Sequence, residues 1–359
     1  MEHTIGIIGF GGMGGGYHCN TCFRDDIPFK LTAVYDLREE CRENARQKGV
    51  KAFDNLQDFL DSHLFEMVVV ATSNNNHCPL ACAALEAGYH VMVEKPAALT
   101  SGEIETMIET GKRCGKLFTV HQNRRWDRNF LIIKKALEAG LIGKPYVIEN
   151  RVVGARGAGA SGMFGWRDLE DHGGGMLLDW GVHMLDQVLY LIDEPIASVY
   201  AEVLPLYGNA VDDYSKIIIT FASGLVAQVE VSTGAFIGTP KWYIQGDQGG
   251  LVMQDESDEF AVIRRSTGAH RIDVPTTAYT LTAPETRSVS KYVVDGVEEL
   301  HYPPKEELPP QDWASLYLNL AGVLDGTEEL VVKPEQVLRC FKVIEAARRS
   351  AVEKRSIQF

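Results

Sequence analysis

The sequence predicts an α/β protein in which a parallel sheet is followed by a second, β-rich domain. In the first third of the chain, short apolar runs alternate with stretches typical of helices, as in a parallel sheet with helices on both faces. From residue 145 onward, β-rich runs are separated by turn residues, as in antiparallel sheets. A chain of 359 residues allows two domains of ordinary size or one large one.

Composition and charge disfavour several classes of protein. Hydrophobic residues make up 45% and charged residues 23% of the chain, as in a globular protein with a sizeable core. Charged residues interrupt every long apolar stretch, so no membrane span is expected. The net charge of −14 disfavours binding to nucleic acid or anionic lipid. Because the N-terminus resembles no secretory signal and the seven cysteines are scattered, we expect a cytoplasmic protein with reduced thiols.

The first apolar run, residues 4–9, predicts a buried strand that leads into a G-x-G-x-x-G pattern. At a strand-to-helix turn this pattern is the fingerprint of a Rossmann dinucleotide site. Its first glycine allows the tight turn, its second lets the backbone approach a pyrophosphate, and its third lets helix and strand pack closely. The diphosphate would lie at the helix N-terminus. The residues predicted to bind the cofactor here are Gly9, Gly11, Gly12, Met13 and Gly14.

A second strand, residues 31–36, ends in Asp36. A carboxylate at this position binds the ribose hydroxyls of the adenosine and repels a 2′-phosphate, which favours NAD over NADP. Arg38 follows two residues later and can stack on the adenine or bind a phosphate, so NADP remains the less favoured alternative. The alternative interpretation is that Asp36 is a solvated acid at the end of a strand and binds no ligand.

Two further strands, residues 66–71 and 89–93, end in polar residues. The carboxyl ends of parallel strands line the crevice in which ligands bind. We therefore expect the polar residues there to contact the cofactor, and the lysine among them to bind or polarise a substrate oxygen as well. The alternative for that lysine is a surface position at the start of a loop. The residues predicted at this edge are Thr72, Asn74, His77, Glu94 and Lys95.

A glycine-rich turn, residues 173–175, leads into an apolar helix with three titratable groups. Asp179 and His183 are four residues apart and Asp186 is three further on, which places all three on one side of a helix. A carboxylate one turn from an imidazole can orient it and raise its basicity, as a general base requires. The alternative is a buried structural pair. Asp186, farther from the glycines, is expected to be a structural partner.

Taken in order, these motifs resemble the glucose–fructose oxidoreductase / inositol dehydrogenase / rhizopine-catabolism family. The resemblance covers essentially the whole chain and includes the Gln-Asn-Arg-Arg-Trp-Asp run at 122–127, with a departure at Ser73, where the family usually has proline. It implies a catalytic group of Lys95, Asp179 and His183. It also implies oxidation of a secondary hydroxyl of a sugar, cyclitol or glycoside, with C3 of a glycoside as one candidate, by hydride transfer to NAD and without a metal.

The resemblance further implies a Rossmann domain over residues 1–121 and an α+β domain over 122–359, with an open, mainly antiparallel sheet and assembly into homo-oligomers. The β-rich runs support such a sheet, and the Ser223-Gly224 step reads as a hairpin turn. A last helix, about residues 334–354, is expected to pack back toward the first domain. The runs lie at 145–153, 196–206, 214–222, 225–234 and 241–246.

The wall of the substrate pocket follows less directly from the sequence. A Gly- and Ala-rich stretch, residues 154–162, predicts a mobile loop over the site. Candidates for substrate contacts are Arg125, Trp126, Trp166 and, in addition, Tyr317; Trp166 is equally compatible with a core position. Two other functions stay open: a dinucleotide-binding regulator without turnover, and a reductase of a small imine or ketone.

Overall fold

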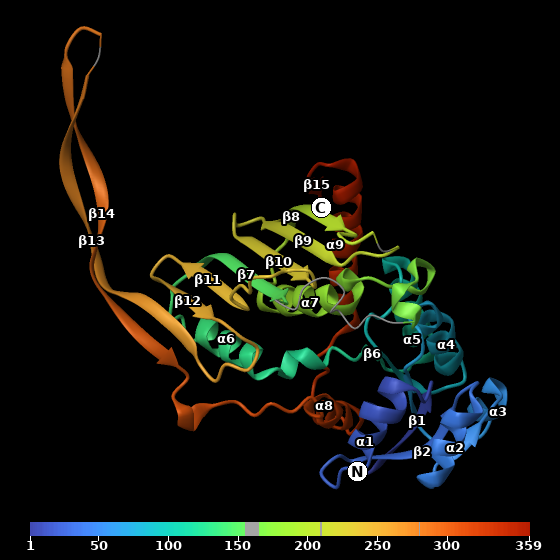
Figure 1. Cartoon of the computed structure of the whole chain (residues 1–359). Coiled ribbons are helices and arrows are strands. Elements are labelled where there is room, and N and C mark those ends of the chain that lie inside the picture. The colour runs from blue at the N-terminus through green and yellow to red at the C-terminus, as the bar shows by residue number, and fades with distance from the viewer. Residues whose placement is uncertain (155–164, 209, 280) are drawn as a thin grey trace.

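The computed structural model describes residues 1–154, 165–208, 210–279 and 281–359, and two sheets dominate it (Figure 1). Sheet A has six parallel strands in the order β3-β2-β1-β4-β5-β6, and sheet B has nine in the order β14-β13-β12-β11-β7-β10-β9-β8-β15. The predicted α/β fold, with a parallel first sheet and a mainly antiparallel second one, is confirmed.

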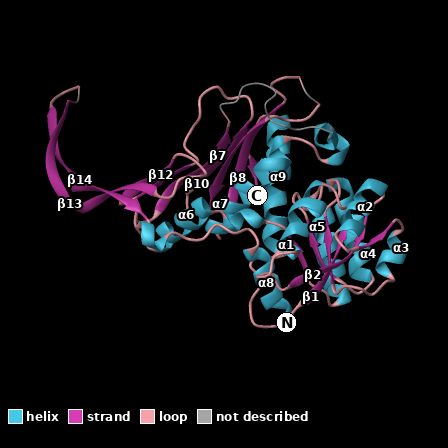
Figure 2. Ribbon diagram, turned by 60° about the horizontal axis from the view of Figure 1, so that its bottom comes forward, coloured by secondary structure: helices cyan, strands magenta, loops and turns pink. Residues whose placement is uncertain are grey.

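Sheet A occupies the first third of the chain and is flanked by helices α1 to α5 (Figure 2). Its central strands are buried along their whole length, as in the MVVV run of β4, because helices cover both faces. The strands are β1 (His3–Ile8), β2 (Phe29–Tyr35), β3 (Lys51–Phe53), β4 (Met67–Val70), β5 (His90–Val93) and β6 (Phe118–Val120). The helices are η1 (Gly12–His18), α1 (Cys19–Cys22), α2 (Glu39–Gln47), α3 (Leu56–Leu60), η2 (Asn74–Asn76), α4 (His77–Glu86) and α5 (Ser101–Cys114).

Sheet B confirms the five predicted strands and the hairpin between two of them. In β9 and β10 buried and partly exposed residues alternate, because helices cover one face of the sheet only. Among its described strands β7 and β10 are parallel neighbours, and the other pairs are antiparallel. The strands are β7 (Pro145–Val153), β8 (Ile196–Leu204), β9 (Tyr214–Phe221), β10 (Val226–Ser232), β11 (Trp242–Gly246), β12 (Gly249–Met253), β13 (Ala261–Tyr279), β14 (Pro284–Tyr302) and β15 (Ile357–Gln358).

The helices of the second part connect the two sheets. Helix α9 packs on α7 and β8 and also reaches α5 beside sheet A, and α8 returns to sheet A, where the Tyr317 ring lies 5.6 Å from that of Phe29. We propose the domain boundary near residue 121, between β6 and β7, with α8 as a late addition to the first domain. The helices are η3 (Asn123–Trp126), α6 (Arg128–Glu138), η4 (Gly165–Asp168), η5 (Glu170–His172), η6 (Leu177–Gly181), α7 (Val182–Leu191), η7 (Lys305–Glu307), α8 (Ser315–Leu324) and α9 (Pro334–Glu353).

Strands β13 and β14 form a hairpin that extends far beyond the other strands of sheet B (Figures 1 and 2). The hairpin was not predicted from the sequence, because most of its residues are exposed and no buried face imposes an apolar alternation on its outer part. Among the helices of the described residues, none is both long and apolar enough to cross a bilayer.

Candidate active site

The glycine turn after β1 has the close approaches that a dinucleotide loop requires. Gly9 has a φ of +89°, and a Cβ there would lie 2.6 Å from the carbonyl oxygen of Ala71. A Cβ at Gly14 would overlap the carbonyl oxygen of Gly9, whereas Gly12 has open space around it. The turn is therefore tight on its inner side and accessible on its outer side, which fits a pyrophosphate held by backbone amides.

Asp36 and Arg38 lie against this turn. The Phe10 N–H donates to Asp36 Oδ2 at 2.7 Å, and the Arg38 backbone N–H donates to Asp36 Oδ1 at 2.8 Å. The Arg38 guanidinium pairs with the same carboxylate at 3.1 Å and reaches over Gly11. Burial raises the pKa of Asp36, but the hydrogen bonds from Arg38 and Phe10 outweigh it and hold this pKa below its ordinary value. An anionic Asp36 thus lies where the adenosine ribose is expected.

Three of the polar residues predicted to contact the cofactor are turned into the protein. His77 is fully buried, with Nδ1 2.9 Å from the carbonyl oxygen of Pro96 and Nε2 3.2 Å from that of Thr72. Asn74 is also buried, and its Nδ2 donates to the carbonyl oxygen of Gly173 at 2.9 Å. Together with the buried Glu94, they shape the crevice instead of offering free polar atoms to a cofactor. Thr72 remains partly exposed.

Lys95, which follows strand β5, forms an ion pair with Asp179 on the η6 turn before α7. Lys95 Nζ donates to Asp179 Oδ1 at 2.9 Å and to the Asp179 carbonyl oxygen at 3.0 Å, and Arg167 Nε lies 3.7 Å from the same Oδ1. Burial raises the pKa of Asp179, but Lys95 and Arg167 outweigh it and hold this pKa below its ordinary value. The contact joins the strand-end lysine of the first domain to the glycine-rich turn of the second.

The expectation that Asp179 orients His183 is wrong. The His183 ring is hydrogen-bonded to a different group, with Nδ1 3.1 Å from Gln122 Oε1. Asp179 lies on the π-helical turn η6 just before α7, and its carboxylate is taken by Lys95, because a cation is a stronger partner than a neutral imidazole.

His183 is held as a neutral base. Burial lowers its pKa well below the ordinary 6.5, and the charges of Lys95 and Arg124 lower it further. An amide oxygen accepts only, so Gln122 fixes the proton on Nδ1. Nε2 makes no hydrogen bond to the part of the chain that the structure describes, which leaves it as the nitrogen able to accept a proton.

Arg125 does not form a pocket wall, contrary to the prediction. Its side chain is buried, and Nε and Nη2 donate to the two carboxylate oxygens of Asp186 at 2.8 and 2.7 Å. Asp186 is thereby confirmed as a structural partner. Tyr317 is also interior: it is fully buried, and its hydroxyl lies 2.6 Å from His18 Nδ1.

Replacing Arg125 with methionine is expected to lower the free energy of unfolding by about 3–5 kcal/mol, because it leaves the buried Asp186 without its partner. Urea unfolding followed by circular dichroism measures the change. The matched control is Arg128→Met, since Arg128 is partly exposed and its ion pair with Glu259 spans 3.5 Å; its expected cost is about 1 kcal/mol or less. Equal losses in both variants would contradict a special role of the buried pair.

Aromatic and guanidinium groups that the sequence did not single out lie near Asp179. The Arg124 guanidinium is 4.3 Å from the centroid of the Trp180 ring and 5.4 Å from that of Trp313, within the range of cation–π contacts. Arg167 lies 4.3 Å over Trp166. In the sequence Arg124, Arg167 and Trp180 stand next to predicted site residues, whereas Trp313 does not. Trp166 is partly exposed, and Trp126 is partly buried against the core; the predicted loop lies, except for Gly154, outside the described residues.

A buried cluster of two histidines and a glutamate lies behind Lys95. His18 Nε2 and His121 Nδ1 are 2.7 and 2.8 Å from Glu94 Oε1, and all three groups lie as close together as metal ligands do. His18 bridges Glu94 and Tyr317 through hydrogen bonds, whereas neither ring nitrogen of the buried His121 forms a hydrogen bond with a described residue. The three residues are far apart in the sequence, which is why no ligand spacing pointed to them.

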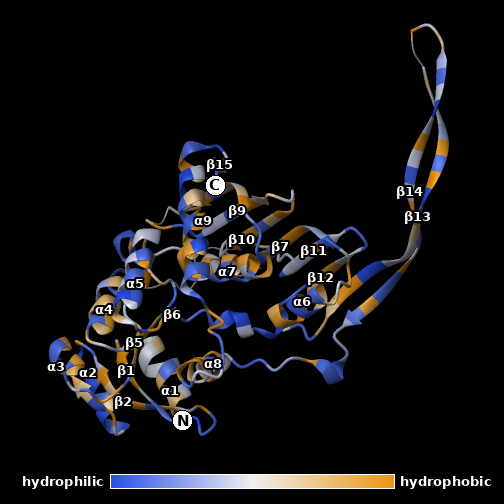
Figure 3. Ribbon diagram, turned by 180° about the vertical axis from the view of Figure 1, so that it is seen from behind, coloured by the Kyte–Doolittle hydropathy of each residue, from blue (hydrophilic) through white to orange (hydrophobic). Residues whose placement is uncertain are grey.

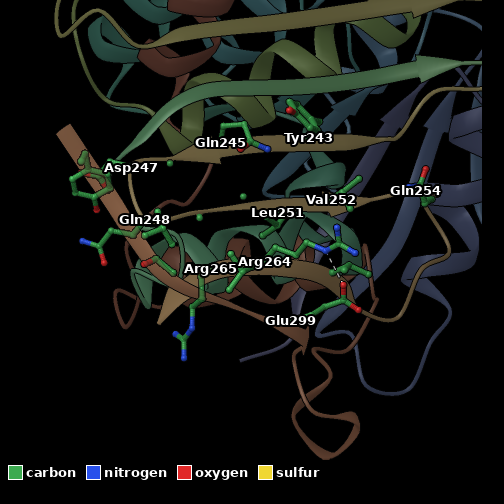
Figure 4. Close-up of a pocket in the computed structure, with 18 residues that line it drawn as sticks. Tyr243, Gln245, Asp247, Gln248, Leu251, Val252, Gln254, Arg264, Arg265 and Glu299 are labelled. Carbon is green, nitrogen blue, oxygen red and sulfur yellow. Dashed lines mark hydrogen bonds and ion pairs between the residues drawn. The ribbon is translucent and has the colours of Figure 1, made fainter. Parts of the chain in front are cut away.

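A cavity of about 740 Å³ lies away from this chemistry, on the outer face of sheet B (Figure 4). Tyr243, Val252 and Arg264 are among its lining residues, and the dashed line in Figure 4 marks the ion pair of Arg264 with Glu299. It contains none of the residues predicted to bind the cofactor or the substrate.

Comparison with known proteins places the chain in a family. A model described as "Oxidoreductase family, NAD-binding Rossmann fold" matches residues 3–122, and one for the GFO/IDH/MocA C-terminal domain matches 130–252. Myo-inositol 2-dehydrogenase of Thermotoga maritima is 32% identical over 241 residues, which cover 65% of this chain and 70% of that protein. D-glucoside 3-dehydrogenase of Escherichia coli is 31% identical over 209 residues, 57% of this chain and 58% of that protein.

A solved structure of an NAD-binding protein from Listeria innocua is 37% identical, has a TM-score of 0.84, and covers 100% of this chain and 97% of its own. The match thus extends over the whole chain, including both sheets. The chain belongs to the GFO/IDH/MocA family of NAD-binding oxidoreductases.

Proposed function

We propose that the protein is an NAD-dependent dehydrogenase that oxidises a secondary hydroxyl of a sugar, cyclitol or glycoside. The observation that carries the proposal is the meeting of Lys95 with Asp179 next to a neutral His183. A cation, an anion and a base at one edge of a dinucleotide crevice are the groups that alcohol oxidation needs. A regulator without turnover has no use for a proton-transfer group.

In this mechanism bound NAD supplies the hydride acceptor. The substrate hydroxyl gives its proton to Nε2 of His183, while Gln122 keeps the other ring nitrogen protonated. The Lys95 ammonium stabilises the alkoxide that develops on the same oxygen. Asp179 holds the ammonium in place and can accept a hydrogen bond from a neighbouring hydroxyl of the substrate.

The substrate class rests on the site and on the relatives. One relative is named for myo-inositol and another for a D-glucoside, so polyols with several adjacent hydroxyls are the first compounds to test, with C3 of a glycoside as one candidate position. The experiment is a panel of inositols, sugars and aryl glycosides with NAD, followed at 340 nm. Absence of NADH formation with every compound would overturn the polyol proposal and favour a regulator or an imine or ketone reductase.

We propose NAD as the preferred cofactor because the anionic Asp36 lies where a 2′-phosphate would approach. Asp36→Asn keeps an acceptor for the Phe10 N–H while it removes the charge. It is expected to raise the ratio of kcat/KM for NADP to that for NAD by about 10- to 100-fold, since a charged hydrogen bond contributes roughly 1.5–3 kcal/mol.

The matched variant for this test is Arg38→Ala, which is expected to reduce the use of NADP more than that of NAD, because the guanidinium reaches over Gly11 of the turn. Steady-state kinetics with both cofactors measures the two ratios. A wild-type preference for NADP, or an unchanged ratio in Asp36→Asn, would refute the assignment.

We also propose a cytoplasmic homo-oligomer. All seven cysteines are free, which supports a reducing compartment. Tyr146, Tyr200 and Tyr243 are 52%, 38% and 37% exposed on strands of sheet B, and exposed apolar surface of this kind is commonly covered by a second subunit.

A further inference from the structure

The outer part of the β13–β14 hairpin, residues 267–297, stands away from the rest of the molecule; we call it the arm (Figure 1). Up to Arg265, β13 pairs with β12 on one side and β14 on the other, but within the described residues the arm pairs only with itself. None of its described residues is buried. A two-stranded ribbon without a packed face is marginally stable at best, so the arm needs a cover that the described part of this chain does not supply.

The strand register places an apolar stripe on one face of the arm. Val274 lies directly opposite Val289, and the next two pairs on that face are Ile272 with Lys291 and His270 with Val293, because residues two apart share a face. Ile272 and Val289 remain 40% and 42% exposed. Figure 3 shows the apolar segments along the ribbon.

The opposite face of the outer arm is polar. Its directly opposed pairs include Asp273 with Ser290, Pro275 with Ser288, and Thr277 with Thr286. Nearer the sheet, Tyr292 and Val294 on this face line the cavity of Figure 4 instead. The stripe of Ile272, Val274, Val289 and Val293 is thus the surface that a partner would bury.

We propose that the arm packs through this stripe on a second copy of the chain. The arm carries three basic and three acidic residues, so its net charge is zero, while the whole chain has −14. A ribbon of zero net charge is not repelled by a second acidic body, and it lacks the basic excess that a nucleic acid or an anionic membrane attracts. The charged residues are Arg271, Arg287 and Lys291 against Asp273, Glu285 and Asp295.

The length of the arm suits the same partner. Residues 267–279 of β13 extend beyond the sheet, and at roughly 3.3 Å per residue they reach about 40 Å, enough to cross a small domain. In a two-fold arrangement each copy would receive the arm of the other, which closes the assembly and covers both arms at once.

The test is the mass of the full-length protein in solution. Val274→Lys combined with Val289→Glu removes the apolar centre of the stripe but keeps an opposite-charge pair across the ribbon, so the hairpin itself stays paired. The matched control, Thr277→Lys with Thr286→Glu, places the same charges directly opposite each other on the other face. Sedimentation velocity should show the stripe variant at half the wild-type mass or less, and the control at the wild-type mass.

A second measurement separates this proposal from the homo-oligomer on which it rests. Amide hydrogen exchange of residues 269–279 and 284–294 should be slow in the wild-type assembly and at least tenfold faster in the stripe variant, with NADH binding unchanged in both. A monomeric wild type would overturn both proposals. An assembled wild type with fast-exchanging arms, or a stripe variant of wild-type mass, would overturn this one alone. If the stripe variant fails to fold, replacement of residues 267–297 by an Asn-Gly turn tests the same loss of mass.

Discussion

His183→Ala is expected to lower kcat by about 10²- to 10⁴-fold, the usual contribution of a positioned general base. The imidazole is buried, neutral and held by Gln122, so its replacement by alanine removes the base to which the mechanism assigns the proton. The cofactor turn lies in the other domain, and binding of NADH, measured by fluorescence, should stay within about twofold of wild type, because the variant removes no predicted cofactor contact.

The control for His183→Ala is His172→Ala, at a partly exposed histidine paired with Asp171 on a short turn of the same region. It should leave kcat near that of wild type. If His183→Ala keeps full turnover, His183 is not the base. If wild-type protein shows NADH binding but no turnover with any polyol, and His183→Ala behaves identically, the regulator interpretation is favoured.

Lys95→Met is expected to lower kcat/KM by about 10²- to 10³-fold, comparable to the loss of one oxyanion-stabilising donor. Methionine preserves the length of the side chain but neither the charge nor the hydrogen bonds to Asp179. The partner carboxylate then remains half-buried without its nearest cation, so part of the loss comes from Asp179 no longer being held.

A pH profile distinguishes an electrostatic role of Lys95 from a structural one. Burial is the largest cause that lowers the His183 pKa, and the Lys95 charge is the next. A general base is active when deprotonated, so the acidic limb of kcat/KM should lie below pH 6.5 in wild type and shift upward in Lys95→Met. An activity loss without any upward shift would contradict the proposed coupling between the two groups.

The elements of the fold could be predicted where burial imposes a pattern. Strands β7 to β11 alternate, or run apolar, because one or both faces are covered, and their predicted ranges agree with the structure to within three residues at most ends. The β13–β14 hairpin has no buried face in its outer part, so its sequence shows no regular alternation of apolar and polar residues. Its pattern becomes apparent only from the register.

The site could be predicted at the level of motifs but not of partners. The order of the motifs along the chain predicted that Lys95 and Asp179 lie in one crevice, and the structure shows them in contact. Which of two neighbouring arginines points inward is decided by a distant carboxylate, since Arg125 binds Asp186 while Arg124 stacks on Trp180. Gln122 as the partner of His183 likewise depends on the packing of η3 against α7.

The return of α8 to sheet A has a consequence for synthesis on the ribosome. Tyr317 packs against Phe29 and bonds to His18, so a nascent chain of the first 121 residues still lacks the helix that covers both. The cofactor-binding part of the chain is therefore synthesised first, but α8, the helix that completes its packing, is synthesised only near the end. Until α8 emerges, that half exposes an aromatic patch, and we expect chaperones to engage it there while the second domain is being made.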